Sequence, residues 1–173
     1  MIVEIGGNGT VGANSYTTQV YADTYHTLYG NTDWAGLTAD KEAALIQGTR
    51  SIDLLYGPLM LSFKRVNSAS PLLFPRMPFF DNNQQLLSYV IPVCLQDAVC
   101  EVALMYMKGI DIFPLKNIDG NIKVNKVKVG EIEVESQYAG KSGELESFNS
   151  FRKVDLILYP IIRQPATSII LGR

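Results

Sequence analysis

The chain has 173 residues, of which 47% are hydrophobic and 10% are aromatic. This length accommodates one domain with extended arms, and it excludes a (β/α)8 barrel or a two-domain dehydrogenase. The 15 basic and 17 acidic residues give a formal net charge of -2, so no overall positive field points to nucleic acid or to an anionic membrane. The apolar content excludes disorder throughout the chain and leaves apolar surface available for a partner.

The sequence predicts a mainly α-helical fold, a helical bundle of about four helices with a β-hairpin and extended N- and C-terminal arms. One domain is expected over residues 1–173, with the N-terminal arm at residues 1–16. In that arm a short strand precedes a flexible glycine run, and Gly7–Gly12 matches the G-x-G-x-x-G pattern of dinucleotide sites. A Rossmann unit also needs a helix that opens at the last glycine and a second hydrophobic strand, so no cofactor is expected.

Residues 17–115 are predicted to form the helical core. Thr18 can cap a first helix that runs to about Tyr29, with tyrosines repeating every four residues on one of its faces. A second helix is expected from after Thr38 to a stop at Gly57 and its following proline.

Pro92 suits the first turn of a third helix, which is expected to end near Gly109. Most of its faces are apolar. Its polar residues fall close together around the helix axis, so we expect them to form its solvent-facing strip: Asp97, Glu101 and Lys108.

A proline-rich loop at residues 66–91 is unusually apolar. Loops of this length without secondary structure are normally functional or held by a partner. We therefore expect the loop to contact another subunit or a partner, through Phe74, Arg76, Met77, Phe79 and Phe80.

Alternating apolar residues predict a β-hairpin at residues 120–138. Lysines lie on its first strand and glutamates on its second, so the charges can pair across the hairpin or between copies of the chain. A last helix is expected at residues 147–163 and a C-terminal tail at residues 164–173. The candidate interface residues of the hairpin and the tail are Lys123, Lys126, Lys128, Glu131, Glu133, Glu135, Ile169, Ile170, Leu171 and Arg173.

No catalytic or metal site can be assembled from the sequence, so we expect no enzyme activity and no bound metal. His26 is the only histidine, and the calcium-loop-like stretch at residues 117–121 lacks a closing glutamate. Cys94 and Cys100 face different sides of one expected helix, which excludes an intrachain disulfide. The longest apolar run is short and interrupted by proline, so we expect no membrane partner.

Nucleic-acid binding is the competing interpretation of the charged residues. Its possible footprint is Lys116, Lys123, Lys126 and Lys128, together with Lys64, Arg65 and Arg76 near the aromatic Phe74 and Phe79. Single-strand binding requires aromatic side chains in a basic groove, and the adjacent acidic strand weakens this footprint.

Several stretches of the chain occur in a familiar order that covers most of its length. They are Ile2-Val3-Glu4, Ala13-Asn14-Ser15-Tyr16, Lys41-Glu42-Ala43-Ala44-Leu45-Ile46-Gln47, Thr49-Arg50, Asp53, Leu73-Phe74-Pro75-Arg76, Ile91-Pro92, Val127-Lys128-Val129-Gly130 and Ile132-Glu133-Val134. This ordered combination resembles the tailed-phage head-to-tail connector proteins that are often labelled putative DnaT-like single-stranded-DNA-binding proteins.

The resemblance implies a structural virion protein at the head-tail junction, assembled in the host cytoplasm. Such an adaptor, or head completion protein, forms a closed homo-oligomeric ring of roughly twelve copies beneath the phage portal. It joins the portal to a tail or nozzle (stopper) protein and leaves a channel through which DNA passes non-specifically. The alternative is the replication-type single-stranded-DNA-binding protein that the family label names.

Overall fold

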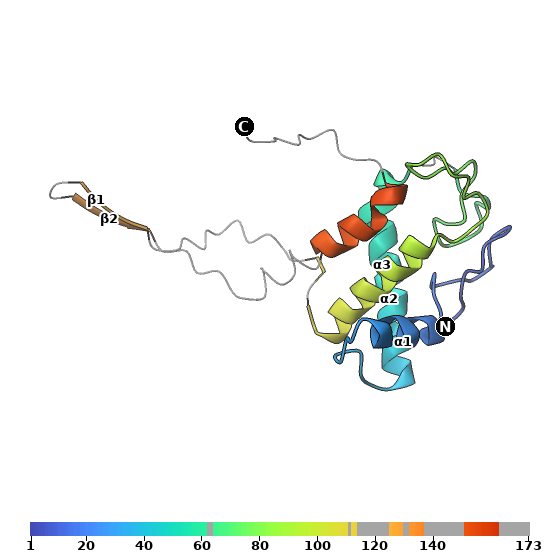
Figure 1. The fold of residues 1–173 in the computed structure, drawn as a ribbon, viewed down its shortest axis with the longest axis horizontal. Helices are drawn as coiled ribbons and strands as arrows, with labels where there is room; N and C mark the ends of the chain where they lie inside the picture. Colours follow the sequence, from blue (N-terminus) through green and yellow to red (C-terminus); the bar gives the residue numbers. More distant parts are fainter. Residues whose placement is uncertain (62–63, 111, 114–124, 130–131, 137–150, 163–173) are drawn as a thin grey trace.

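The computed structural model describes residues 1–61, 64–110, 112–113, 125–129, 132–136 and 151–162. Four α-helices form the body in this part of the chain: α1 (Gln19–Leu28), α2 (Thr38–Tyr56), α3 (Val93–Met107) and a last helix at residues 151–158 (Figure 1). Short 3-10 turns follow α2 at Gly57–Leu59 and the last helix at Tyr159–Ile161. The predicted mainly α-helical class is confirmed. None of the helices within the described ranges is both long enough and apolar enough to cross a membrane.

Local signals in the sequence explain where the helices begin and end. The Thr18 hydroxyl accepts a hydrogen bond from the Tyr21 backbone N–H at 3.1 Å, so Thr18 caps α1 as predicted. Helix α2 ends at Tyr56, directly before the predicted stop at Gly57. Helix α3 begins directly after Pro92.

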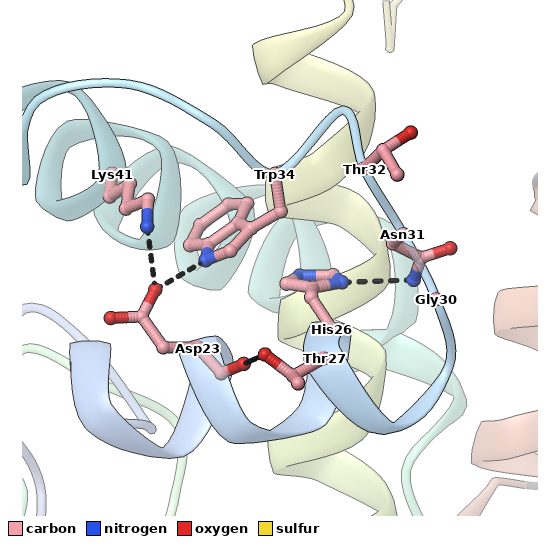
Figure 2. A pocket seen from close by; sticks show the side chains of 8 residues that line it. All are labelled: Asp23, His26, Thr27, Gly30, Asn31, Thr32, Trp34 and Lys41. Atoms are coloured by element: carbon pink, nitrogen blue, oxygen red, sulfur yellow. Dashed lines mark hydrogen bonds and ion pairs between the residues drawn. The ribbon is translucent and has the colours of Figure 1, made fainter.

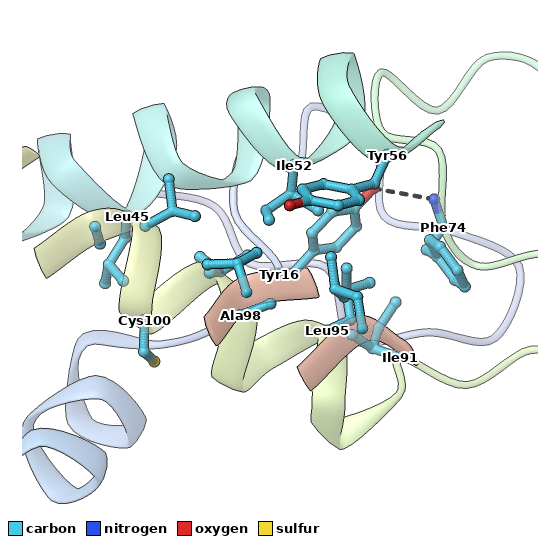
Figure 3. Packing of buried hydrophobic residues seen from close by; sticks show 14 of the residues in the cluster. Tyr16, Leu45, Ile52, Tyr56, Phe74, Ile91, Leu95, Ala98 and Cys100 are labelled. Carbon is cyan, nitrogen blue, oxygen red and sulfur yellow. Dashed lines mark hydrogen bonds between the residues drawn. The ribbon is translucent and has the colours of Figure 1, made fainter. Parts of the chain in front are cut away.

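Helices α2 and α3 pack against each other across the core, and the last helix adds side chains to it (Figure 3). Leu45 and Ile52 of α2 are fully buried, as are Leu95 of α3 and Leu158 of the last helix. At Gly48 the two long helices approach each other closely, because a Cβ atom placed on it would stand 3.0 Å from the Val99 carbonyl oxygen.

We predict that Gly48→Ala destabilises the protein by about 1–3 kcal/mol, although alanine is the better helix former by up to ~1 kcal/mol. The added methyl group meets backbone atoms of α3, namely the Val99 oxygen at 3.0 Å and the Ala103 nitrogen at 3.2 Å. Urea unfolding followed by circular dichroism measures the difference. Gln47→Ala, at the exposed neighbouring position, is the control and is expected within about 0.5 kcal/mol of the wild type. A Gly48→Ala protein as stable as the wild type would contradict this tight helix contact.

The proline-rich loop folds into the core of its own chain. Phe74 and Phe79 are fully buried and stack edge to face with ring centroids 5.2 Å apart. The Tyr16 hydroxyl accepts hydrogen bonds from the backbone N–H groups of Leu73 at 3.0 Å and Phe74 at 3.1 Å. It donates in turn to the Asp53 carboxylate of α2 at 2.6 Å. The loop is thereby tied to both the N-terminal arm and α2.

The N-terminal arm is also held, in contrast to the flexible run expected from its glycines. Glu4 is buried, and its carboxylate accepts hydrogen bonds from the backbone N–H groups of Gly6 at 3.0 Å and Thr10 at 2.8 Å. The glycine-rich loop therefore folds around the Glu4 carboxylate, which accepts hydrogen bonds from backbone N–H groups of the loop. Helix α1 begins well after the last glycine of the run, Gly12, which is unlike the geometry of a dinucleotide site.

Two strands, β1 (Asn125–Val129) and β2 (Ile132–Ser136), pair in antiparallel fashion. In Figure 1 this strand pair lies apart from the helices. The rest of the predicted hairpin, at residues 120–124, 130–131 and 137–138, lies outside the described residues.

Candidate interaction surfaces

The five loop residues predicted to contact a partner fall into two groups. Phe74 and Phe79 belong to the core, and Arg76 is only 6% exposed. The Arg76 guanidinium lies 5.3 Å from the Phe74 ring and donates to the Leu73 carbonyl at 3.2 Å. These three side chains therefore hold the loop in place within the chain. Met77 and Phe80 remain at the surface, 36% and 48% exposed.

Met77 and Phe80 line a groove of about 450 Å³. Its other lining residues are Leu61, Lys64, Pro78, Asp81 and Asn82. The backbone N–H of Asn82 donates to the Pro160 carbonyl at 2.8 Å, and the Leu61 N–H donates to the Ile161 carbonyl at 3.2 Å. The turn that follows the last helix therefore braces two walls of this mostly apolar groove.

Apolar side chains that are more than half exposed occur on every part of the helical body. They are Ile5 and Val11 on the arm, Val20, Leu28 and Tyr29 at α1, Leu37 and Leu54 at α2, Leu86 on the loop, Val93 on α3, and Leu156 and Tyr159 at the last helix. Apolar residues that are exposed singly are ordinary, whereas a contiguous apolar surface, such as the groove that Met77 and Phe80 line, is typical of contact with a partner.

The predicted solvent strip of α3 is wrong at Glu101. This residue is 8% exposed, and its carboxylate accepts hydrogen bonds from the Tyr25 hydroxyl at 2.7 Å and the Lys153 ammonium at 2.6 Å. Asp97 accepts from the Tyr21 hydroxyl at 2.6 Å. Helix α1 and the last helix cover this face of α3, and phenol and ammonium groups satisfy the carboxylates they cover. The matching four-residue spacings of the tyrosines on α1 and the carboxylates on α3 were the signal for this contact.

The side chains that line a pocket beside α1 form hydrogen bonds and ring contacts with one another (Figure 2). Asp23 accepts hydrogen bonds from the Trp34 indole N–H at 2.7 Å and from the Lys41 ammonium at 2.8 Å. His26 packs on Trp34 with ring centroids 4.5 Å apart, and its Nδ1 lies 3.0 Å from the Asn31 side-chain nitrogen. These contacts tie the segment between α1 and α2 to the body. No group of three or more metal-binding side chains gathers anywhere within the described ranges.

Burial lowers the pKa of His26 to about 4, from 6.5, because the charged ring would lose its hydration. The unfolded chain therefore takes up this proton first on acidification. The contribution of neutral His26 to the free energy of unfolding is therefore fully present above pH 6.5 and is lost as the pH falls toward 4. At pH 5 the loss amounts to about 2 kcal/mol.

The pH dependence of stability that comes from His26 must be measured against a variant without this histidine, because the titration of Asp53 changes the free energy of unfolding in the opposite direction. Burial raises the pKa of Asp53 to about 6, so its contribution is complete below pH 3.8 and is lost as the pH rises through 6. We predict that the difference in unfolding free energy between wild type and His26→Phe shifts by about 2 kcal/mol between pH 8 and pH 5, in favour of the variant at low pH. Urea titrations at both pH values measure it. A difference independent of pH would show that His26 is accessible to water.

The pairing register of β1 and β2 shows which residues of the hairpin lie opposite each other. Lys126 pairs with Glu135 and Lys128 with Glu133 across the strands. Each lysine position therefore faces a glutamate position of opposite charge. The other candidate residues of these segments lie outside the described residues: Lys123, Glu131, Ile169, Ile170, Leu171 and Arg173.

Comparison with known proteins supplies a family. The model of a family described as "Putative DnaT-like ssDNA binding protein" matches residues 1–173. No curated protein and no solved structure matches the chain. Because the family model matches over its whole length, the chain belongs to the family of putative DnaT-like single-stranded-DNA-binding proteins.

Proposed function

We propose that this protein is a structural, non-catalytic subunit of a phage head-to-tail connector. Copies of the chain form a closed ring beneath the portal, join it to a tail or nozzle protein and leave a channel through which DNA passes. The observation that carries this proposal is the apolar groove that exposes Met77 and Phe80 on an otherwise well-packed body, because a ring subunit must bury surface against two neighbours and two further proteins.

The strand pair supports the same proposal. An isolated two-stranded hairpin is at best marginally stable in water and needs a third element to pack on. Strands β1 and β2 lie apart from the helices of their own chain, so a neighbouring copy is the natural source of that element. The lysine and glutamate positions are matched across the register, which leaves little net charge on the pair to attract phosphate.

Single-stranded DNA binding is the second candidate, and exposed aromatic side chains of the proline-rich loop favour it beside the family description. Phe80 is 48% exposed and Tyr89 is 43% exposed, and Lys64 lines the same groove as Phe80. Bases stack on exposed aromatic rings with about 1–3 kcal/mol each, and a nearby ammonium group attracts phosphate. The nucleic-acid footprint predicted from the sequence included Arg76, Phe74 and Phe79. These three side chains are buried and cannot contact DNA.

Sedimentation of the purified chain distinguishes the two candidates. The chain is run alone, with its cognate portal ring, and with a labelled single-stranded oligonucleotide. The connector proposal expects co-sedimentation with the portal while the oligonucleotide stays unbound. Oligonucleotide binding that is weakened by Phe80→Ala and steeply reduced by salt, without portal binding, would overturn it in favour of the second candidate.

A further inference from the structure

The described part of the chain ends beside the apolar groove. Ile162 forms an antiparallel bridge with Met60, and the next residue of that strand segment, Leu61, lines the groove. Asn82, which also lines the groove, is hydrogen-bonded to the Pro160 carbonyl. Residues 163–173 therefore begin at the edge of a groove that exposes Met77 and Phe80 to water.

We propose that the segment 169–171 of the same chain, Ile-Ile-Leu, docks in this groove and covers Met77 and Phe80 in the free chain. This inference concerns the single chain, so it does not depend on the proposed connector role.

The chemistry of the segment matches that of the groove. The three consecutive aliphatic residues can pack against the groove lining, which Leu61, Met77 and Phe80 make mostly apolar. Arg173 follows the aliphatic run by two positions, and Asp81 supplies an acidic group on the groove wall. Asp81 keeps its carboxylate oriented by accepting hydrogen bonds from two backbone N–H groups of its own turn, at 2.9 and 2.7 Å.

The short connection favours the segment of the same chain over that of a neighbour. Only residues 163–168 separate the last described residue from Ile169, and they span at most about 20 Å when extended. A linker of this length gives an effective concentration on the order of millimolar, far above that of a second copy in dilute solution. Docking also removes apolar side chains from water without a second molecule.

Disulfide trapping in the full chain tests the proposal. Lys64→Cys on the groove wall is combined with Ile170→Cys, in a background where the half-buried Cys94 is replaced by serine. We expect an intramolecular disulfide at low protein concentration, detected by mass spectrometry of the non-reduced chain. A mixture of isotopically light and heavy chains separates the two sources, and a disulfide found only between chains would overturn docking within one chain.

A disulfide could also form because the short linker keeps the two cysteines close. The deciding comparison is therefore the rate of disulfide formation in the cysteine pair with and without Phe80→Asp. Docking on the groove predicts that this change slows disulfide formation about tenfold, as expected when about 1.4 kcal/mol of docking energy is lost. Val20→Asp, at an exposed apolar position on α1 that does not line the groove, is the control and should leave the rate unchanged. Equal rates for the parent pair and its Phe80→Asp form would show that the segment is only tethered and would overturn the proposal.

Discussion

Phe74→Ala is expected to lower the free energy of unfolding by about 3–5 kcal/mol. Its ring is fully buried between Tyr16 and Phe79, with centroid distances of 6.1 and 5.2 Å, and Arg76 lies over its face. Truncation to alanine removes these contacts and leaves a cavity that backbone tied by the Tyr16 hydroxyl cannot fill. Urea unfolding followed by Trp34 fluorescence measures the loss.

The same truncation six residues later is the matched control. Phe80 is 48% exposed, so Phe80→Ala is expected to change the stability of the helical body by less than about 1 kcal/mol. The pair of variants thus separates a core residue of the loop from a surface residue of the loop. Similar losses for Phe74→Ala and Phe80→Ala would contradict this division, and a small loss for both would mean that the loop is not part of the core.

Lys153→Met is expected to destabilise the protein by about 2–3 kcal/mol, because it leaves the Glu101 carboxylate buried without its counter-ion. The Glu101 side chain is 9% exposed, while that of Lys153 is 50% exposed. Water therefore reaches the lysine end of the pair, which keeps the expected loss below the 3–5 kcal/mol typical of a fully buried pair. Thermal and urea unfolding both report it.

A surface ion pair provides the control for this prediction. Lys108 and Asp33 are 2.9 Å apart, but their side chains are 41% and 59% exposed, so Lys108→Met should cost less than about 1 kcal/mol. Adding Glu101→Gln to Lys153→Met should restore part of the lost stability, because the buried charge is then gone. If Lys153→Met and Lys108→Met cost the same, the last helix is not anchored through Glu101.

These two predictions bear on how the chain presents its surfaces. Phe74 and Lys153 hold the proline-rich loop and the last helix on the body. The groove lies on that loop, and the turn that follows the last helix is hydrogen-bonded to it. A variant that loosens either segment would also disturb the groove. For this reason the tests of partner binding use the exposed Phe80, whose replacement leaves the core intact.

Local chemistry allowed the helices to be predicted from the sequence. A hydroxyl at Thr18, a proline at position 92 and a glycine at position 57 act through their own backbone and nearest neighbours, so their effects need no knowledge of the fold. The predicted ends of α1, α2 and α3 lie within about two residues of the observed ones. The likeness to the putative DnaT-like family was likewise readable from the order of short sequence stretches, and the model of that family matches the whole chain.

The sequence by itself thus determined the helical class, the helix ends and the family, while only the tertiary structure decided which side chains are buried. The loop aromatics and Arg76 have the composition of a partner surface, but Tyr16 and Asp53, distant in sequence, hold the loop so that Phe74 and Phe79 enter the core. Glu101 has the charge of a solvent-facing residue, but α1 and the last helix supply a phenol and an ammonium group that make its burial favourable. The physical reason is the same in both cases: burial depends on contacts between segments far apart in the chain, and periodicity within one segment cannot reveal them.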